Sequence, residues 1–180
     1  MYTAWWVLNM PAQGKLFLLD ANSLITSQSL YYPQEMIPEL WEWMINKAHA
    51  GLIKIPLEIY GEVLAGKDDP LTRWLKTPNI KDHLVLAEAP NADLVARVTY
   101  EGYAPDLNDI ELAQIGRDPF LISYGLVDPA NRCVVSLETP KPSAKRQNRK
   151  VPDVCNGLGV ECCTVFQMLR HLGFKTGWRK

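Results

Sequence analysis

The 180-residue sequence has almost no net charge, few histidines and no long hydrophobic run. Its 19 basic and 20 acidic side chains give a formal charge of −1, which excludes a uniformly basic nucleic-acid-binding protein. No apolar stretch reaches the roughly 18 residues that a membrane span needs, and the N-terminus has neither the basic start nor the cleavage site of a signal peptide. We therefore expect a soluble cytoplasmic protein without a membrane partner.

Neither the cysteines nor the histidines have the spacing of a metal site. The adjacent Cys162 and Cys163 cannot form a Cys-x-x-Cys knuckle, and the other cysteines also lie in apolar surroundings. The histidines show no mutual spacing that would suggest a metal triad or a Cys–His nucleophile. We interpret the cysteines as buried thiols and the histidines as surface or helix-end residues. These residues are Cys133, Cys155, Cys162 and Cys163, and His49, His83 and His171.

Short apolar runs alternate with helical patterns along the chain. Residues 16–19 are continuously apolar, and residues 51–56 and 132–138 are similar, as expected of strands buried between helices. Residues 159–174 form a further apolar stretch that runs into a final amphipathic helix. Helical patterns cover residues 33–50, where Pro38 delays the regular helix by a turn, and residues 56–66, 69–77, 90–103 and 108–128. The alternation predicts an α/β fold of three layers (α/β/α) around a short, mostly parallel sheet.

The chain length favours one domain. We expect this domain to span residues 15–180, preceded by an extension at residues 1–14; a packed N-terminal arm is the alternative for this segment. Residues 139–152 form a basic loop with no acidic residue. Five cations make it a candidate for RNA phosphate binding. They are Lys141, Lys145, Arg146, Arg149 and Lys150.

Acidic residues follow two of the predicted strands. Asp20 and Glu138 lie where parallel strands end, which is where α/β sheets place their ligands. The predicted helices add Glu62, with Glu58 one turn before it, and Asp118, which precedes a proline and is expected to cap the helix that follows. Clustered carboxylates either raise one another's pKa values or bind a hard cation such as Mg²⁺ or Mn²⁺. The alternative is that Asp20 serves only as a turn or N-cap residue.

Four stretches resemble, in order, the motifs of the PIN superfamily of metal-dependent nucleases: "LFLLDANSLI", "IPLEIYGEVLAG", "RDPFLISYGL" and "RCVVSLETP". The later "KVPDVCNGLGVECCTVFQMLRHLG" resembles a little-characterised prokaryotic branch of that superfamily. The resemblance covers roughly residues 15–175 and implies a PIN-like fold. It also implies that Asp20 is the metal ligand after the first strand, Glu62 the helix glutamate, and Asp118 the aspartate that opens a later helix.

The resemblance assigns further residues to this site. Asn22 and Ser23 match small polar residues that orient metal, water or phosphate. Ser136 and Glu138 fall where many members have Thr-x-Asp, so the glutamate is a departure from the pattern. The fourth carboxylate is therefore either Glu138 or Asp153, which follows the basic loop.

The resemblance implies a Mg²⁺- or Mn²⁺-dependent ribonuclease that hydrolyses RNA phosphodiester bonds. In the family such proteins are often toxins of toxin–antitoxin pairs and often dimerise, which implies an antitoxin partner and a homodimer. A degenerate module that binds RNA or protein without cutting is the alternative, because Glu138 replaces the usual aspartate. An aspartyl phosphatase is disfavoured, because its mechanism needs a second acid where this chain has Asn22.

Three tryptophans are candidates for stacking on unpaired bases. Trp41 lies on the apolar stripe of the 33–50 pattern and is expected in the core. Trp43 falls off this stripe and is the better surface candidate, and Trp74 lies in the short helical pattern at residues 69–77.

Overall fold

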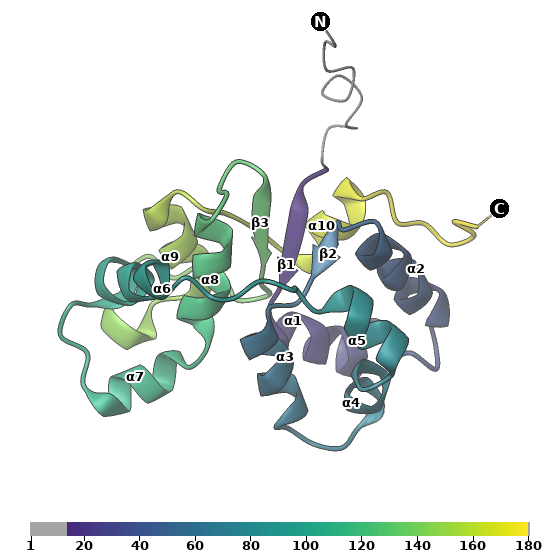
Figure 1. The fold of residues 1–180 in the computed structure, drawn as a ribbon, viewed down its shortest axis with the longest axis horizontal. Coiled ribbons are helices and arrows are strands. Elements are labelled where there is room, and N and C mark those ends of the chain that lie inside the picture. Colours follow the sequence, from purple (N-terminus) through teal and green to yellow (C-terminus); the bar gives the residue numbers. More distant parts are fainter. Residues whose placement is uncertain (1–13, 180) are drawn as a thin grey trace, which may run out of the picture.

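The structure is a computed structural model that describes residues 14–179. The predicted extension at residues 1–14 therefore lies, except for Gly14, outside the described residues. The buried apolar side chains of the described part form one contiguous core. Figure 1 shows strands at the centre of the molecule with helices around them.

The sheet has four parallel strands, as the alternating sequence pattern predicts. They are β1 (Leu16–Leu19), β2 (Ile53–Lys54), β3 (Arg132–Val135) and β4 (Glu161–Cys163), in the order β2-β1-β3-β4. The two central strands, β1 and β3, pair over their full length, from Leu16 with Arg132 to Leu19 with Val135. Since both central strands run in the same direction, their carboxyl ends meet at one edge of the sheet.

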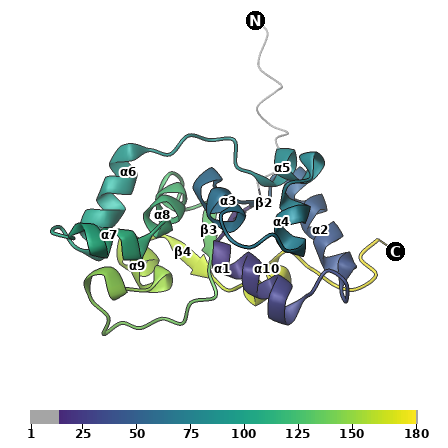
Figure 2. The same ribbon diagram turned by 90° about the horizontal axis from the view of Figure 1, so that it is seen from below.

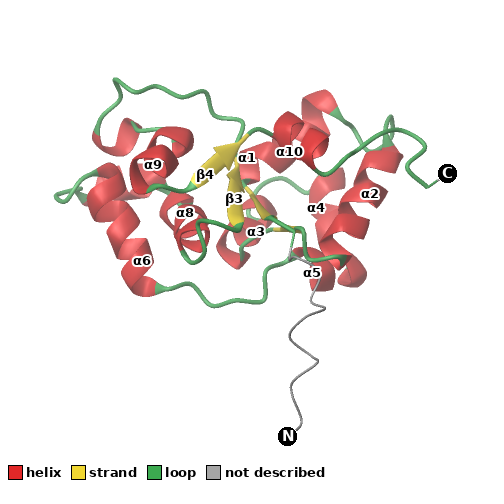
Figure 3. Ribbon diagram, turned by 90° about the horizontal axis from the view of Figure 1, so that it is seen from above, coloured by secondary structure: helices red, strands yellow, loops and turns green. Residues whose placement is uncertain are grey.

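Helices cover both faces of this sheet, which confirms the predicted three-layer α/β class. In Figure 3, α6, α8 and α9 lie to one side of the strands, and α2, α5 and α10 lie to the other. The helices of the first half are α1 (Ala21–Thr26), α2 (Pro38–His49), α3 (Leu57–Leu64), α4 (Pro70–Leu75) and α5 (Pro78–Leu84), with a π-helical segment at Ser27–Tyr31.

The second half is also mainly helical between its strands. Its helices are α6 (Ala92–Arg97), α7 (Asp109–Ile115), α8 (Asp118–Leu126), α9 (Val151–Leu158) and α10 (Val165–His171), with a π-helical segment at Val98–Tyr103 and a 3₁₀ turn at Arg146–Asn148. None of the helices within residues 14–179 is long and apolar enough to cross a lipid bilayer.

The prediction that Trp43 is a surface aromatic is wrong. Its side chain is only 2% exposed, and its ring lies 5.2 Å, between centroids, from that of Phe174 in the C-terminal segment. The C-terminal segment therefore covers the side of α2 that the sequence pattern left polar. Trp41 is buried as predicted and donates a hydrogen bond from Nε1 to Tyr32 O at 2.8 Å.

Gly125 lets α8 approach the sheet closely. A Cβ atom at this position would lie 2.7 Å from Val160 Cγ1 and 3.2 Å from Val134 Cγ2, so a methyl group would overpack the interface. We expect Gly125→Ala to lower the free energy of unfolding by about 1–3 kcal/mol, measured by urea denaturation. The matched control is Gly61→Ala on α3, where a Cβ meets nothing within 4 Å and should stabilise the helix by about 0.5–1 kcal/mol. Equal stability of the two variants would contradict this account.

Candidate active site

Asp20 lies at the carboxyl edge of the sheet, directly after β1. Its backbone N–H donates to Val135 O at 3.0 Å and so extends the β1–β3 pairing by one residue. The side chain is only 4% exposed, and its Oδ2 accepts a hydrogen bond from Ser136 Oγ at 3.3 Å. Asp20 holds the N-cap position of α1, but its side chain makes no capping hydrogen bond. Capping therefore does not explain why a carboxylate is buried here.

Asp118 joins this edge of the sheet from the start of α8. The helix begins at Asp118 itself and Arg117 holds the cap position, so the predicted N-cap role of Asp118 is wrong by one residue. Instead, Asp118 Oδ2 accepts a hydrogen bond from Tyr103 Oη at 3.2 Å. Tyr103 ends the π-helical segment that follows α6, and nothing in the sequence pattern marks it as part of the site.

The pKa values of both aspartates are raised by burial and by nearby negative charges. Burial, together with the nearby negative charges of Glu62 and Glu138, raises the pKa of Asp20 to about 7. Burial, together with the charges of Asp20, Glu138 and Glu62, also raises the pKa of Asp118 to about 7. The predicted cluster of Asp20, Glu62, Asp118 and Glu138 is therefore an electrostatically coupled group around one edge of the sheet. Figure 2 shows α1, α3 and α8 converging on this edge.

The two glutamates of the cluster have different surroundings. Glu62 on α3 lies at the surface. Neighbouring atoms partly desolvate its carboxylate and so raise its pKa, while the positive charge of Arg117 lowers it. Glu138 accepts hydrogen bonds from Lys150 Nζ at 3.0 Å and from the backbone N–H of Val151 at 2.8 Å. Since Val151 is the first residue of α9, the Glu138 carboxylate is tied to the start of that helix.

The remaining predicted residues surround the cluster without joining it. Asp153 Oδ2 accepts a hydrogen bond from the backbone N–H of Lys141, and its charge is not among the main causes of the raised pKa values of Asp20 and Asp118. Ser23 is buried and donates from Oγ to Val135 O at 3.1 Å, whereas Asn22 is exposed. Of the two candidates for the fourth carboxylate, Glu138 is therefore the one near the aspartates.

Glu58 lies on the outer side of the site. It lines a cavity of about 460 Å³ together with Gly61, Glu62, Ala65 and Arg117. Its Oε2 atom is buried and has no hydrogen-bond partner among residues 14–179. The cavity therefore lies along α3, next to the carboxylate cluster.

Most cations of the basic loop make contacts within the protein. Arg146 donates from Nε and Nη2 to Glu111 at 2.7 Å and from Nη1 to Asp106 at 2.7 Å. Arg149 donates to the Gly102 and Asp153 carbonyls, and Lys150 pairs with Glu138. The side chains of the two remaining cations, Lys141 and Lys145, are exposed and form no ion pair within the described part of the chain.

The chemistry of the cluster suits a hard divalent cation, but its present geometry is not that of a closed metal site. Its donors are all carboxylate oxygens, which Mg²⁺ and Mn²⁺ prefer, and a cation would relieve the repulsion that raises the aspartate pKa values. As the side chains stand, no group of three or more His, Cys, Asp or Glu residues among those described could hold a metal ion. Binding a cation would therefore require the carboxylates to move closer together.

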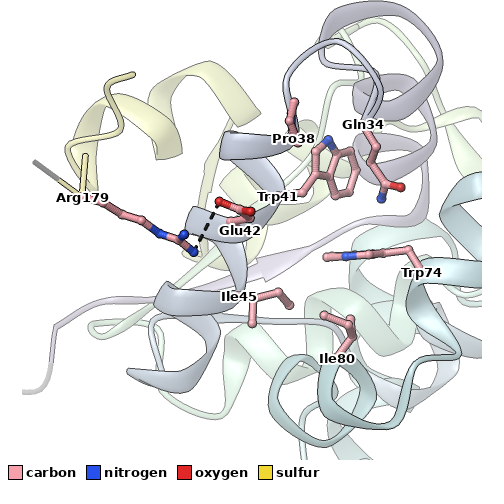
Figure 4. A pocket seen from close by; sticks show the side chains of 8 residues that line it. All are labelled: Gln34, Pro38, Trp41, Glu42, Ile45, Trp74, Ile80 and Arg179. Atoms are coloured by element: carbon pink, nitrogen blue, oxygen red, sulfur yellow. Dashed lines mark ion pairs between the residues drawn. The ribbon is translucent and has the colours of Figure 1, made fainter. Parts of the chain in front are cut away.

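A second, apolar cavity of about 350 Å³ lies over α2, α4 and α5, apart from the carboxylates (Figure 4). Trp41 and Trp74 lie edge to face within it, with ring centroids 4.9 Å apart. The ion pair between Glu42 and Arg179, at 3.3 Å, borders it. Because Trp41 is only 3% exposed, Trp74 is the tryptophan with the more accessible ring at this cavity.

Comparison with known proteins identifies a family but no function. No curated protein and no solved structure matches the chain. One family model, described as a domain of unknown function (DUF4411), matches residues 17–176. This range contains all four carboxylates of the cluster, the basic loop and the cavity beside α3. The chain therefore belongs to the DUF4411 family.

Proposed function

We propose that this protein is a Mg²⁺- or Mn²⁺-dependent ribonuclease of PIN-like type. The observation that carries the proposal is a pair of aspartates at the carboxyl edge of a parallel sheet, the buried Asp20 and the partly buried Asp118, with the charges of Glu62 and Glu138 beside them. Removing two carboxylates from solvent, in part or in full, next to further negative charges destabilises a fold, so such a pair is expected where function requires it. The ordered resemblance to PIN motifs supports the same function.

The four carboxylates would hold the cation, with Asp20 and Asp118 as the central ligands. When bound, the cation supplies Lewis acidity towards the phosphate and lowers the pKa of the attacking water. Ser136 orients the Asp20 carboxylate through its 3.3 Å hydrogen bond, and Tyr103 orients that of Asp118. Glu138 fixes the start of α9 and adds negative charge at the site.

The RNA backbone would lie across the carboxyl edge, with the exposed Lys141 and Lys145 at its side. Because Arg146, Arg149 and Lys150 already contact protein groups, the basic loop offers fewer free cations than its composition suggests. The resemblance also implies a toxin of a toxin–antitoxin pair, an antitoxin partner and a homodimer. These remain predictions that rest on the resemblance alone.

The test is cleavage of single-stranded and structured RNAs by the purified protein with Mn²⁺ or Mg²⁺. We expect cleavage in either metal and none after EDTA is added in excess, because chelation removes the cation that activates water. Restoring Mn²⁺ after EDTA should restore cleavage, which controls for damage to the fold. A folded protein that cleaves none of these RNAs in either metal would contradict the ribonuclease proposal.

A second candidate is a module that binds RNA or a protein partner without cutting. It is favoured by the hydrogen bonds of Glu138, because both of its carboxylate oxygens already accept hydrogen bonds, from Lys150 and Val151, and so are less available to bind a cation. The same assay separates the two functions. Retention of RNA by a folded protein that does not cleave it supports the binding module, and metal-dependent cleavage excludes it.

A further inference from the structure

Arg117, which is exposed, is the cation that lines the cavity beside the carboxylate cluster, and its guanidinium group forms no ion pair within the described residues. By contrast, Arg146 and Lys150 of the basic loop each contact acidic side chains. A free guanidinium group beside a group of carboxylates is positioned to bind an anionic ligand that approaches them.

The local structure holds Arg117 next to the site. Gly116 before it has a φ of 53°, a left-handed conformation that favours glycine and turns the chain between α7 and α8. Arg117 Cζ lies 5.7 Å from the centroid of the Phe120 ring, within cation–π range. Since the next residue is Asp118, the backbone itself keeps this guanidinium group close to the carboxylate cluster.

Arg117 also lines the cavity of about 460 Å³ beside α3. The opposite wall consists of Gly61 and Ala65, whose small side chains leave room for a bulky ligand, and of Glu58 and Glu62. The positive charge of Arg117 is close enough to Glu62 to lower its pKa. The cavity therefore lies between the proposed cleavage site and the guanidinium group of Arg117, which is suited to bidentate phosphate recognition.

We propose that Arg117 and this cavity form a subsite for a backbone phosphate of the RNA strand, next to the bond that is cleaved. This inference rests on the proposed ribonuclease function and names a residue that positions its substrate. Arg117 donates hydrogen bonds to non-bridging oxygens of that phosphate, and the neighbouring nucleoside occupies the cavity. Phosphate contacts of this kind set affinity and position with little sequence readout.

The test measures binding of a fluorescein-labelled single-stranded RNA in the Asp20→Asn background, which prevents cleavage, over a range of KCl concentrations. We expect the further substitution Arg117→Gln to weaken binding about tenfold and to reduce the slope of log K against log salt by about 0.7, the value for one phosphate contact on a single strand. Arg117→Lys should restore part of the affinity. The matched control is Arg97→Gln on α6, because Arg97 pairs with Glu101 and does not line the cavity.

Cleavage kinetics in the otherwise unchanged protein give a second readout. We expect Arg117→Gln to raise KM about tenfold with a smaller change in kcat, as for an interaction present in both the ground state and the transition state. If Arg117 only balances the charge of Glu62, the salt slope and KM will match those of Arg97→Gln, and the subsite is overturned while the ribonuclease proposal stands. If neither the wild type nor any variant binds or cleaves RNA, the ribonuclease function fails and the subsite fails with it.

Discussion

Asp20→Asn and Asp118→Asn are each expected to lower the rate of metal-dependent RNA cleavage about 100-fold or more. Each substitution removes one negative charge and one cation-binding carboxylate but keeps the size of the side chain. The loss should appear mainly in kcat, because in the proposed mechanism these groups hold the cation that acts on the reacting phosphate. The measurement is single-turnover cleavage with Mn²⁺ at saturating protein. A folded Asp20→Asn protein that cleaves at the wild-type rate would contradict the assignment.

Two matched variants make this prediction specific to the cluster. Asp153→Asn has the same chemistry, but the Asp153 carboxylate only accepts a hydrogen bond from the Lys141 backbone, so the cleavage rate should change less than about threefold. Glu138→Gln should have a larger effect than Asp153→Asn, because the charge of Glu138 acts on both aspartates. If Asp153→Asn lowers the cleavage rate more than Glu138→Gln does, Asp153 is the fourth carboxylate.

The parts of the fold that could be predicted from the sequence are those with a strong local pattern. The apolar runs of β1 and β3 lie between polar segments, and the 33–50 pattern gives α2, which begins at Pro38 as expected. Three short helices were not predicted. They are α1, α5 and α9, each of six to eight residues.

Each missed helix lacks a clear local signal. The sequence after Asp20 has the composition of a turn, α5 begins at Pro78 directly after α4, and α9 contains both Pro152 and Gly157. Helices this short are stabilised by packing against the rest of the protein more than by their own propensity. Their positions therefore depend on contacts that a linear pattern does not contain.

In the candidate site, too, residues with a local sequence signal could be predicted, and contacts between distant segments could not. Asp20 could be predicted because it directly follows a buried strand, and Asp118 because it precedes a helix-starting proline. The hydrogen bond from Tyr103 and the burial of Trp43 depend on segments far apart in the sequence. The same holds for the loop cations, since Arg146 contacts Asp106 and Glu111, which lie 40 and 35 residues earlier. Composition alone therefore overstated the number of loop cations that are free of contacts within the protein.

The pH dependence of stability should report directly on Asp20 and Asp118. The pKa values of Asp20 and Asp118 are raised from 3.8 to about 7 in the folded protein, so the folded state binds more protons than the unfolded state between these values. Stability from these groups is therefore fully present below about pH 4 and is lost as the pH rises through about 7. Without divalent cations, we expect Tm to fall by about 10 °C between pH 5 and pH 8, measured by differential scanning fluorimetry.

Divalent cations and the asparagine variants should each reduce the fall in stability at high pH, the cations by binding the ionised carboxylates and the variants by removing them. At pH 8, Mg²⁺ or Mn²⁺ at about 100 times its Kd should stabilise the wild type by about 2.7 kcal/mol, because it binds the ionised cluster. The Asp20→Asn, Asp118→Asn double variant cannot ionise at these positions, so its Tm should change little between pH 5 and pH 8 and should not respond to either metal. A double variant with the same pH profile as the wild type would show that other groups cause the loss. If the double variant shows no pH dependence but the wild type does not respond to either metal, the aspartates ionise without binding a cation, as expected of a module that does not cut RNA.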